Sequence, residues 1–215
     1  MRGICFSTPL IPKVLDGSKP LTRRLNKHFP TGPEWTGVRV ENGWAIFERN
    51  GSVGAMVKLN YRPGEIRYIK ESWRFVDFSF LGTHWTACVE YKDGQRGNYT
   101  DTVDENTRTG WRSPRFMPEF ASRGKVLIES VTVERLQDIT EEDIFAEGIE
   151  AFWVPTKPEG LSGQYHVAGK WTDFPDIAFQ WLWDSLHKKP GERWADSPFV
   201  EVLTLRLVAE QESGE

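Results

Sequence analysis

Short runs in which apolar and polar residues alternate recur along most of this chain, and they predict a protein built mainly from β-strands. Two such runs flank Glu41-Asn42-Gly43, a sequence typical of a tight hairpin turn. We predict strands at residues 3–6, 38–40, 44–48, 53–59, 66–73, 83–91, 125–136 and 199–208, and an extended segment at 19–25.

Helical spacing of apolar residues is confined to three segments. We predict helices at residues 9–15, 140–146 and 175–187. Pro9 suits the first turn of the first helix, and Gly17 ends it. Thr140 and Asp143 stand at capping-box spacing at the start of the second. The third has one apolar face, formed by Ile177, Ala178, Trp181, Leu182 and Leu186.

The remaining segments are expected to be loops, because they are polar or rich in Gly and Pro. They are residues 26–36, a mobile loop at 93–112 and a loop-like stretch at 155–172. Many strands with three helices set between them are typical of the α+β class. We expect a sheet curled into a small barrel, although the pattern alone does not fix the strand order.

Composition limits the classes of protein that fit this sequence. The chain has 215 residues and a net charge of −4, which favours a single domain and excludes a general coat for polyanions. Cys5 and Cys88 both lie in apolar runs and are expected to be buried free thiols in a reducing cytoplasm. No apolar run approaches 18 residues, so we expect no membrane span. The four histidines lack ligand spacing, so we predict no metal site and no cofactor.

The segment from Gly17 to Arg24 carries the most concentrated chemistry. It places Lys19, Thr22, Arg23 and Arg24 within six positions. A neighbouring lysine can take the proton of a threonine hydroxyl, and guanidinium groups can hold a phosphate, a carboxylate or a base edge. The alternative is a polar surface strand at the edge of a sheet.

Several segments together resemble the ASCH domain, and more closely its phage and prophage branch. They are residues 17–24, 62–73, 111–118, 131–148, 179–185 and 194–199. The resemblance implies a PUA-like small β-barrel with flanking helices over residues 1–208, an elaboration at about 26–112 and a polar tail at 209–215. PUA domains bind RNA, and some small bacterial ASCH proteins hydrolyse N4-acetylcytidine to cytidine and acetate.

The resemblance also assigns roles to individual residues. The family's amidohydrolases use a Lys as proton acceptor, a Thr three positions later as nucleophile and a Glu as proton donor. Here these roles fall on Lys19, Thr22 and Glu147. Arg24 matches a further family position, and we expect it to contact a ligand together with Arg23 and Trp73. The alternative to a catalytic role for Glu147 is a solvated residue on the surface. The alternative to a ligand contact for Trp73 is a residue packed in the core.

Three features depart from the pattern of the small enzymes: Pro20 replaces a Thr, Arg23 replaces an apolar residue, and residues 26–112 are longer than their counterpart. We therefore expect a protein that acts on or recognises a modified nucleoside or RNA, with hydrolysis of N4-acylated cytidine as one reading. The alternative is a non-catalytic module that binds a nucleoside or single-stranded RNA. A nuclease is a third hypothesis, with less support from the sequence. The sequence does not indicate an oligomeric state.

Overall fold

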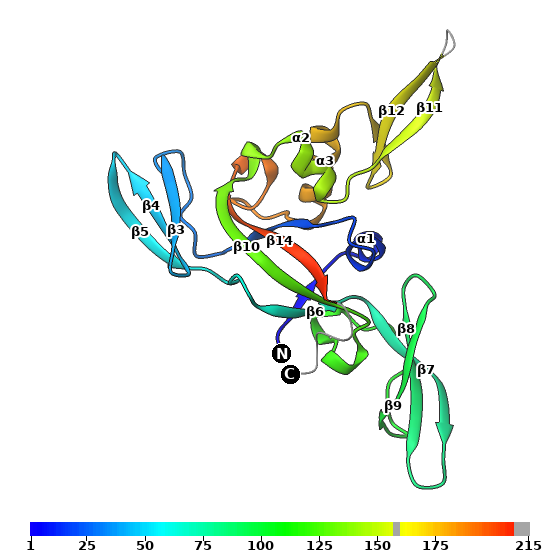
Figure 1. Ribbon diagram of the computed structural model, residues 1–215. Coiled ribbons are helices and arrows are strands. Elements are labelled where there is room, and N and C mark those ends of the chain that lie inside the picture. The colour runs from blue at the N-terminus through cyan, green and yellow to red at the C-terminus, as the bar shows by residue number, and fades with distance from the viewer. Residues whose placement is uncertain (157–159, 209–215) are drawn as a thin grey trace. The chain divides into compact units, whose positions relative to one another are not determined.

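The computed structural model describes residues 1–156 and 160–208 (Figure 1). Contacts divide the chain into two compact units. The first unit comprises Met1–Gly17, Ile66–Leu127 and Arg206–Glu215, and the second comprises Ser18–Glu65 and Ile128–Leu205. The elaboration expected at about 26–112 is thus shared between the units, with its division at Glu65. A single domain over residues 1–208 stays a prediction.

The first unit contains a three-stranded antiparallel sheet, β7-β8-β9, and the parallel pair of β1 with β6. Trp73 and Phe75 on β7 pack with Tyr91 on β8 and with Met117 to form its core. The elements are β1 (Gly3–Cys5), η1 (Thr8–Leu10), α1 (Ile11–Leu15), β6 (Ile66–Lys70), β7 (Trp73–Phe80), β8 (Trp85–Tyr91), β9 (Arg96–Val103), η2 (Pro114–Phe116), η3 (Glu119–Ala121) and the start of β10 (Lys125–Arg135).

The second unit contains two further three-stranded sheets, β3-β4-β5 and β11-β12-β13, and the antiparallel pair of β2 with β14. Asn42 and Gly43 both have positive φ at the turn between β3 and β4, as the hairpin sequence requires. The elements are β2 (Leu21–Leu25), β3 (Gly37–Glu41), β4 (Trp44–Arg49), β5 (Ser52–Lys58), η4 (Leu136–Asp138), α2 (Glu141–Ala146), β11 (Ala151–Thr156), β12 (Gly160–Val167), β13 (Lys170–Thr172), α3 (Pro175–Leu186), η5 (Trp194–Asp196) and β14 (Phe199–Val208).

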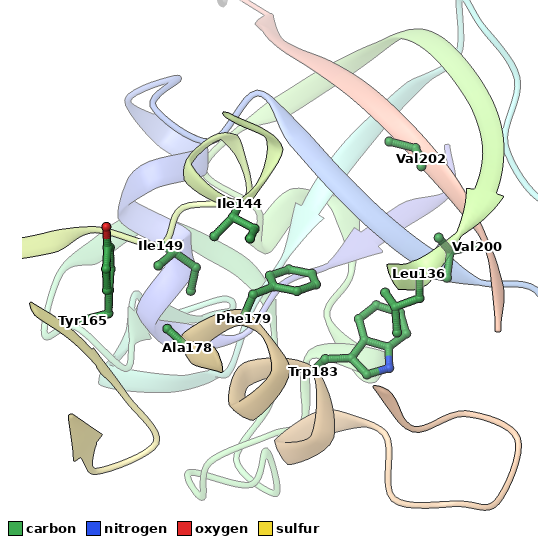
Figure 2. Close-up of a cluster of buried hydrophobic side chains, with 9 residues drawn as sticks. All are labelled: Leu136, Ile144, Ile149, Tyr165, Ala178, Phe179, Trp183, Val200 and Val202. Atoms are coloured by element: carbon green, nitrogen blue, oxygen red, sulfur yellow. The ribbon is translucent and has the colours of Figure 1, made fainter. Parts of the chain in front are cut away.

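The core beside the candidate site is formed by α2, α3 and β14 (Figure 2). Ala178, Phe179 and Trp183 face it from α3, whereas Leu186 is exposed. The buried stripe of α3 is therefore rotated by about one residue from the predicted face, because the aromatic rings of Phe179 and Trp183 are buried in place of Ile177 and Trp181. This core fixes α2 and, with it, Glu147 at the end of that helix.

The structure mixes helices with several sheets whose described strand pairs are mainly antiparallel, which is consistent with the α+β class. The largest sheet has the strand order β1-β6-β10-β14-β2. Within the described residues no sheet closes into a barrel. No helix in the described part of the chain is both long and apolar enough to cross a membrane.

Two segments expected to be loops are strands. Within residues 93–112, β9 pairs with β8, and within 155–172, β12 pairs with β11 and β13. Both strands contain Gly and polar residues, so their side chains give no period-2 apolar signal. Backbone hydrogen bonds to a more apolar neighbour determine them instead, and these cannot be read from the local sequence.

The two cysteines are free, but only Cys88 is buried, and the prediction of a buried Cys5 is wrong. Cys5 ends the short strand β1 with its side chain outward. Burial raises the pKa of the Cys88 thiol, which further suppresses its thiolate.

We expect a thiol reagent to label one cysteine per native chain and two after denaturation. Cys5→Ser should abolish native labelling, and rapid labelling of both thiols in the native protein would contradict this structure.

Candidate functional site

Lys19 and Glu147, which are 128 residues apart in the chain, are in direct contact. Lys19 Nζ lies 2.5 Å from Glu147 Oε2 and donates a second hydrogen bond, of 2.6 Å, to the backbone oxygen of Glu147. A third bond, of 2.9 Å, reaches the carbonyl of Leu21. The three donors of the ammonium group are therefore all used. The proximity expected of Lys19 and Glu147 is present in the structure.

The position of Glu147 follows from the two ends of α2. At the start, the Thr140 side chain accepts a hydrogen bond from the backbone N–H of Asp143, as the capping spacing predicts. At the end, Gly148 has a φ of 92° and turns the chain out of the helix. Glu147 is therefore the helix cap, and its carbonyl lacks an intrahelical partner. Lys19 supplies the missing donor.

Arg23 holds a second set of carboxylates in the same place. Its guanidinium group donates to Glu134 on β10 at 2.5 and 2.9 Å and to Asp143 on α2 at 2.5 Å. The Arg23 side chain is fully buried, whereas those of Glu134 and Asp143 are about one-third exposed. The sequence analysis did not identify Glu134 as a site residue, and it marked Asp143 only as a capping residue. Arg23 thus binds protein carboxylates here, and its expected role as a ligand contact has no support in this arrangement.

Two buried atoms of the cluster have no hydrogen-bond partner among the described residues. They are Nη1 of Arg23 and Oε1 of Glu147, and they lie 3.6 Å apart. One is a donor and the other an acceptor. They form an ion pair whose separation is too long for a hydrogen bond, so each keeps one unused hydrogen-bonding position.

Burial is the largest influence on the pKa of Lys19, and it lowers that pKa from the ordinary value. The Glu147 carboxylate opposes the shift, while the positive charges of Arg24 and Arg23 reinforce it. A lysine with a lowered pKa loses its proton more readily and can serve as a proton acceptor.

Thr22 and Arg24 occupy the other face of the strand. Successive residues of a strand point to opposite faces, so both are out of phase with Arg23 on β2. Thr22 is buried, and within the described residues its hydroxyl makes no side-chain hydrogen bond. Arg24 is half-buried and acts electrostatically on both Lys19 and His187. In the structure, Lys19 and Arg23 both contact Glu147. Thr22 directly precedes Arg23 in β2 and lies on the opposite face of that strand.

Trp73 is a core residue of the first unit. Its side chain is 1% exposed, its ring packs edge-on against Phe75, and the Arg112 guanidinium lies 4.7 Å from the ring centre. A base could not stack on this ring without displacing these neighbours. We therefore leave Trp73 out of the candidate site, in contrast to the sequence-based expectation.

The described residues contain no group of three or more His, Cys, Asp or Glu arranged to hold a metal ion. The contact between Lys19 and Glu147 beside the buried guanidinium group of Arg23 can support proton transfer between a lysine and a carboxylate. Comparison with known proteins adds no identity: no family model, curated protein or solved structure matches this chain.

Proposed function

We propose that this protein is an ASCH-like amidohydrolase that removes the acyl group from an N4-acylated cytidine, with Lys19, Thr22 and Glu147 as its catalytic residues. The contact between Lys19 and Glu147 carries the proposal, because it joins a proton acceptor to a proton donor across 128 residues of sequence. The lowered pKa of Lys19 supports the acceptor role. The resemblance of residues 17–24 and 131–148 to the ASCH family supplies the substrate class.

In the proposed reaction the Thr22 hydroxyl attacks the acyl carbon while the neutral amine of Lys19 takes its proton. The C–N bond then breaks, and the Glu147 carboxyl group protonates the departing amine. Water hydrolyses the resulting acyl-threonine ester, which releases the carboxylic acid and restores Thr22. Lys19 and Glu147 are 1% and 7% exposed, so a substrate can reach them only after neighbouring side chains move.

The proposal includes a PUA-like fold, for which the five-stranded sheet and the short flanking helices are the supporting observations. A second candidate is a module that binds a modified nucleoside or single-stranded RNA without turnover. The use of all three Lys19 donors by protein acceptors favours it, because a lysine held in this way is not free to accept a proton.

Incubation with N4-acetylcytidine separates the two candidates. We expect loss of the acetyl group, followed by absorbance, and a decrease of at least about 100-fold in kcat/KM for Lys19→Ala, Thr22→Val or Glu147→Gln. Thr204→Val, which alters a hydroxyl on the neighbouring strand β14, is the matched control and should retain activity. Saturable binding of the nucleoside without turnover would support the binding module and reject the enzyme.

The pH dependence of turnover follows from the Lys19–Glu147 pair. The reactive form has a neutral Lys19 and a protonated Glu147, which is the same net protonation state as the ion pair. Activity should therefore be lost when the pair loses this proton, as pH rises through the lowered pKa of Lys19. We expect the alkaline limb of the kcat/KM profile below pH ~10, the range of an ordinary lysine. A profile that still rises there, corrected for spontaneous hydrolysis, would contradict the shared-proton scheme.

A further inference from the structure

A pocket of about 250 Å³ lies at the end of β2 that is distant from Lys19. Two loops of the second unit form its sides, residues 26–31 after β2 and residues 189–192 after α3, and Phe199 at the start of β14 also lines it. Pockets for drug-sized ligands are usually larger than about 300 Å³. The volume therefore suits a small molecule with one ring system.

The wall formed by residues 26–31 is supported by buried hydrogen bonds. Asn26 Nδ2 donates to Glu201 Oε1 at 2.8 Å and to the carbonyl of Lys58 at 3.1 Å. Its Oδ1 accepts the backbone N–H of His28, and its carbonyl accepts that of Phe29. Since Asn26 and Glu201 are both buried, this wall is held in place without a ligand.

The opposite wall is supported equally well. Trp183 Nε1 donates to the carbonyl of Glu192 at 2.7 Å, and the Gly191 N–H donates to Asp196 Oδ2 at 2.9 Å. Gly191 has a φ of 82°, a conformation that other residues rarely adopt. Two independently fixed walls indicate a preformed pocket, which lowers the entropic cost of binding.

The chemistry of the lining combines flat apolar surfaces with positive charge. Three prolines, Pro30, Pro190 and Pro198, and the small exposed parts of Phe29 and Phe199 supply the apolar surface. Lys27 and Lys189 lie on opposite walls, both are exposed, and neither forms an ion pair with another described residue. Glu192 is the acidic residue among the lining groups, and it can accept a hydrogen bond from an amino or hydroxyl group of a ligand.

We propose that this pocket binds a phosphate monoester of a small aromatic or heteroaromatic molecule, with the ring against the prolines and the phosphate between Lys27 and Lys189. A phosphate monoester carries close to two negative charges at neutral pH, which matches one lysine from each wall. A nucleoside monophosphate and a simple aryl phosphate share this chemistry. The site is separate from the Lys19–Glu147 cluster and does not depend on the proposed hydrolysis.

Calorimetric titration of the full chain with four probes tests the inference. Cytidine 5′-monophosphate and phenyl phosphate represent the two sources of the ligand, while cytidine and inorganic phosphate each lack one half of it. We expect at least one of the two esters to bind about tenfold or more tightly than either half. Preference for the cytidine ester identifies a nucleotide site, and preference for phenyl phosphate identifies a site for other aryl phosphates.

Substitution of the lysines assigns the binding to this pocket. The double variant Lys27→Ala with Lys189→Ala should bind the preferred ester about tenfold or more weakly than the wild type. The salt dependence of its affinity should also be smaller. Lys188→Ala removes an exposed lysine next to the pocket that does not line it, and should leave affinity unchanged. The three lysines are exposed, so folding should be unaffected. Absence of ester binding, or equal binding by the double variant and the wild type, would overturn the inference.

Discussion

Replacement of Arg23 by Ala is expected to destabilise the second unit by about 3–5 kcal/mol, because it removes the fully buried cation that three carboxylates share. In the folded protein the guanidinium group is fully buried and contacts Glu134, Asp143 and Glu147. Glu147 would keep Lys19 as its remaining cation, whereas Glu134 and Asp143 would lose their hydrogen bonds to the guanidinium group. Glu134 and Asp143 are partly exposed, which allows water to reach them and favours the lower end of the range. Urea unfolding, with midpoint and slope fitted separately, measures the loss.

Arg39 provides the matched control. It also lies between two carboxylates, Glu41 and Glu48, but its side chain is 44% exposed. Exposed ion pairs contribute about 0–1 kcal/mol, so Arg39→Ala should change stability by less than about 1 kcal/mol. Equal losses for the Arg23 and Arg39 variants would show that the Arg23 cluster is solvated in solution and not buried.

Replacement of Glu201 by Ala is expected to cost about 3 kcal/mol or more, because several donors lose a common acceptor. Glu201 is 0% exposed and accepts hydrogen bonds from Asn26 Nδ2 and from the backbone N–H groups of Asn60 and Tyr61, at 2.8 to 3.2 Å. Its carboxylate thus connects β14 to the segment after β5 and to the loop after β2. The midpoints of thermal and urea unfolding should both be lower for this variant than for the wild type. Glu105→Ala, at an exposed position, should leave both midpoints unchanged.

The loss of unfolding free energy caused by Glu201→Ala should also depend on pH. Burial raises the pKa of Glu201 more than its hydrogen bonds lower it. The folded state therefore binds the proton more tightly than the unfolded state, and wild-type stability falls as pH rises from the ordinary glutamate pKa through the raised one. The variant lacks this contribution, so the difference between the two proteins should shrink as pH rises above the ordinary glutamate pKa of about 4.3. A difference that grows over this range of pH would mean that the ionised form is the one stabilised by folding.

The fold was predictable where local sequence determines structure. The hairpin turn at Asn42 and Gly43 and the cap at Thr140 depend on a few adjacent residues, and both are as predicted. β9 and β12 were missed because their neighbours, and not their own side chains, make them strands. The 66–73 strand divides into β6 and β7, since the buried Glu71 pairs with Arg123 where a regular strand was expected to continue.

The candidate site was predictable only in part. The resemblance of two distant segments anticipated the proximity of Lys19 and Glu147. The burial of Arg23 was not predictable, because its partners Glu134 and Asp143 read as an ordinary strand charge and a helix cap. Successive side chains of a strand point to opposite faces, so the sequence alone already predicts that Thr22 and Arg24 lie on the face opposite to Arg23. The pocket at the end of β2 depends on loops that no local pattern brings together.

The pairing of β2 with β14 has a consequence for the order in which the protein is made. Leu25 pairs with Val200, so 175 residues must be synthesised after β2 before its partner strand exists. At about 5–20 residues per second, this takes roughly 10 to 35 s on the ribosome. During that time Lys19 and Arg23 lack the strand beside which they become buried. A nascent chain that stops before β14 therefore presents an unpaired strand edge, a state that favours association with other chains, while the charges of Arg23 and Arg24 oppose it.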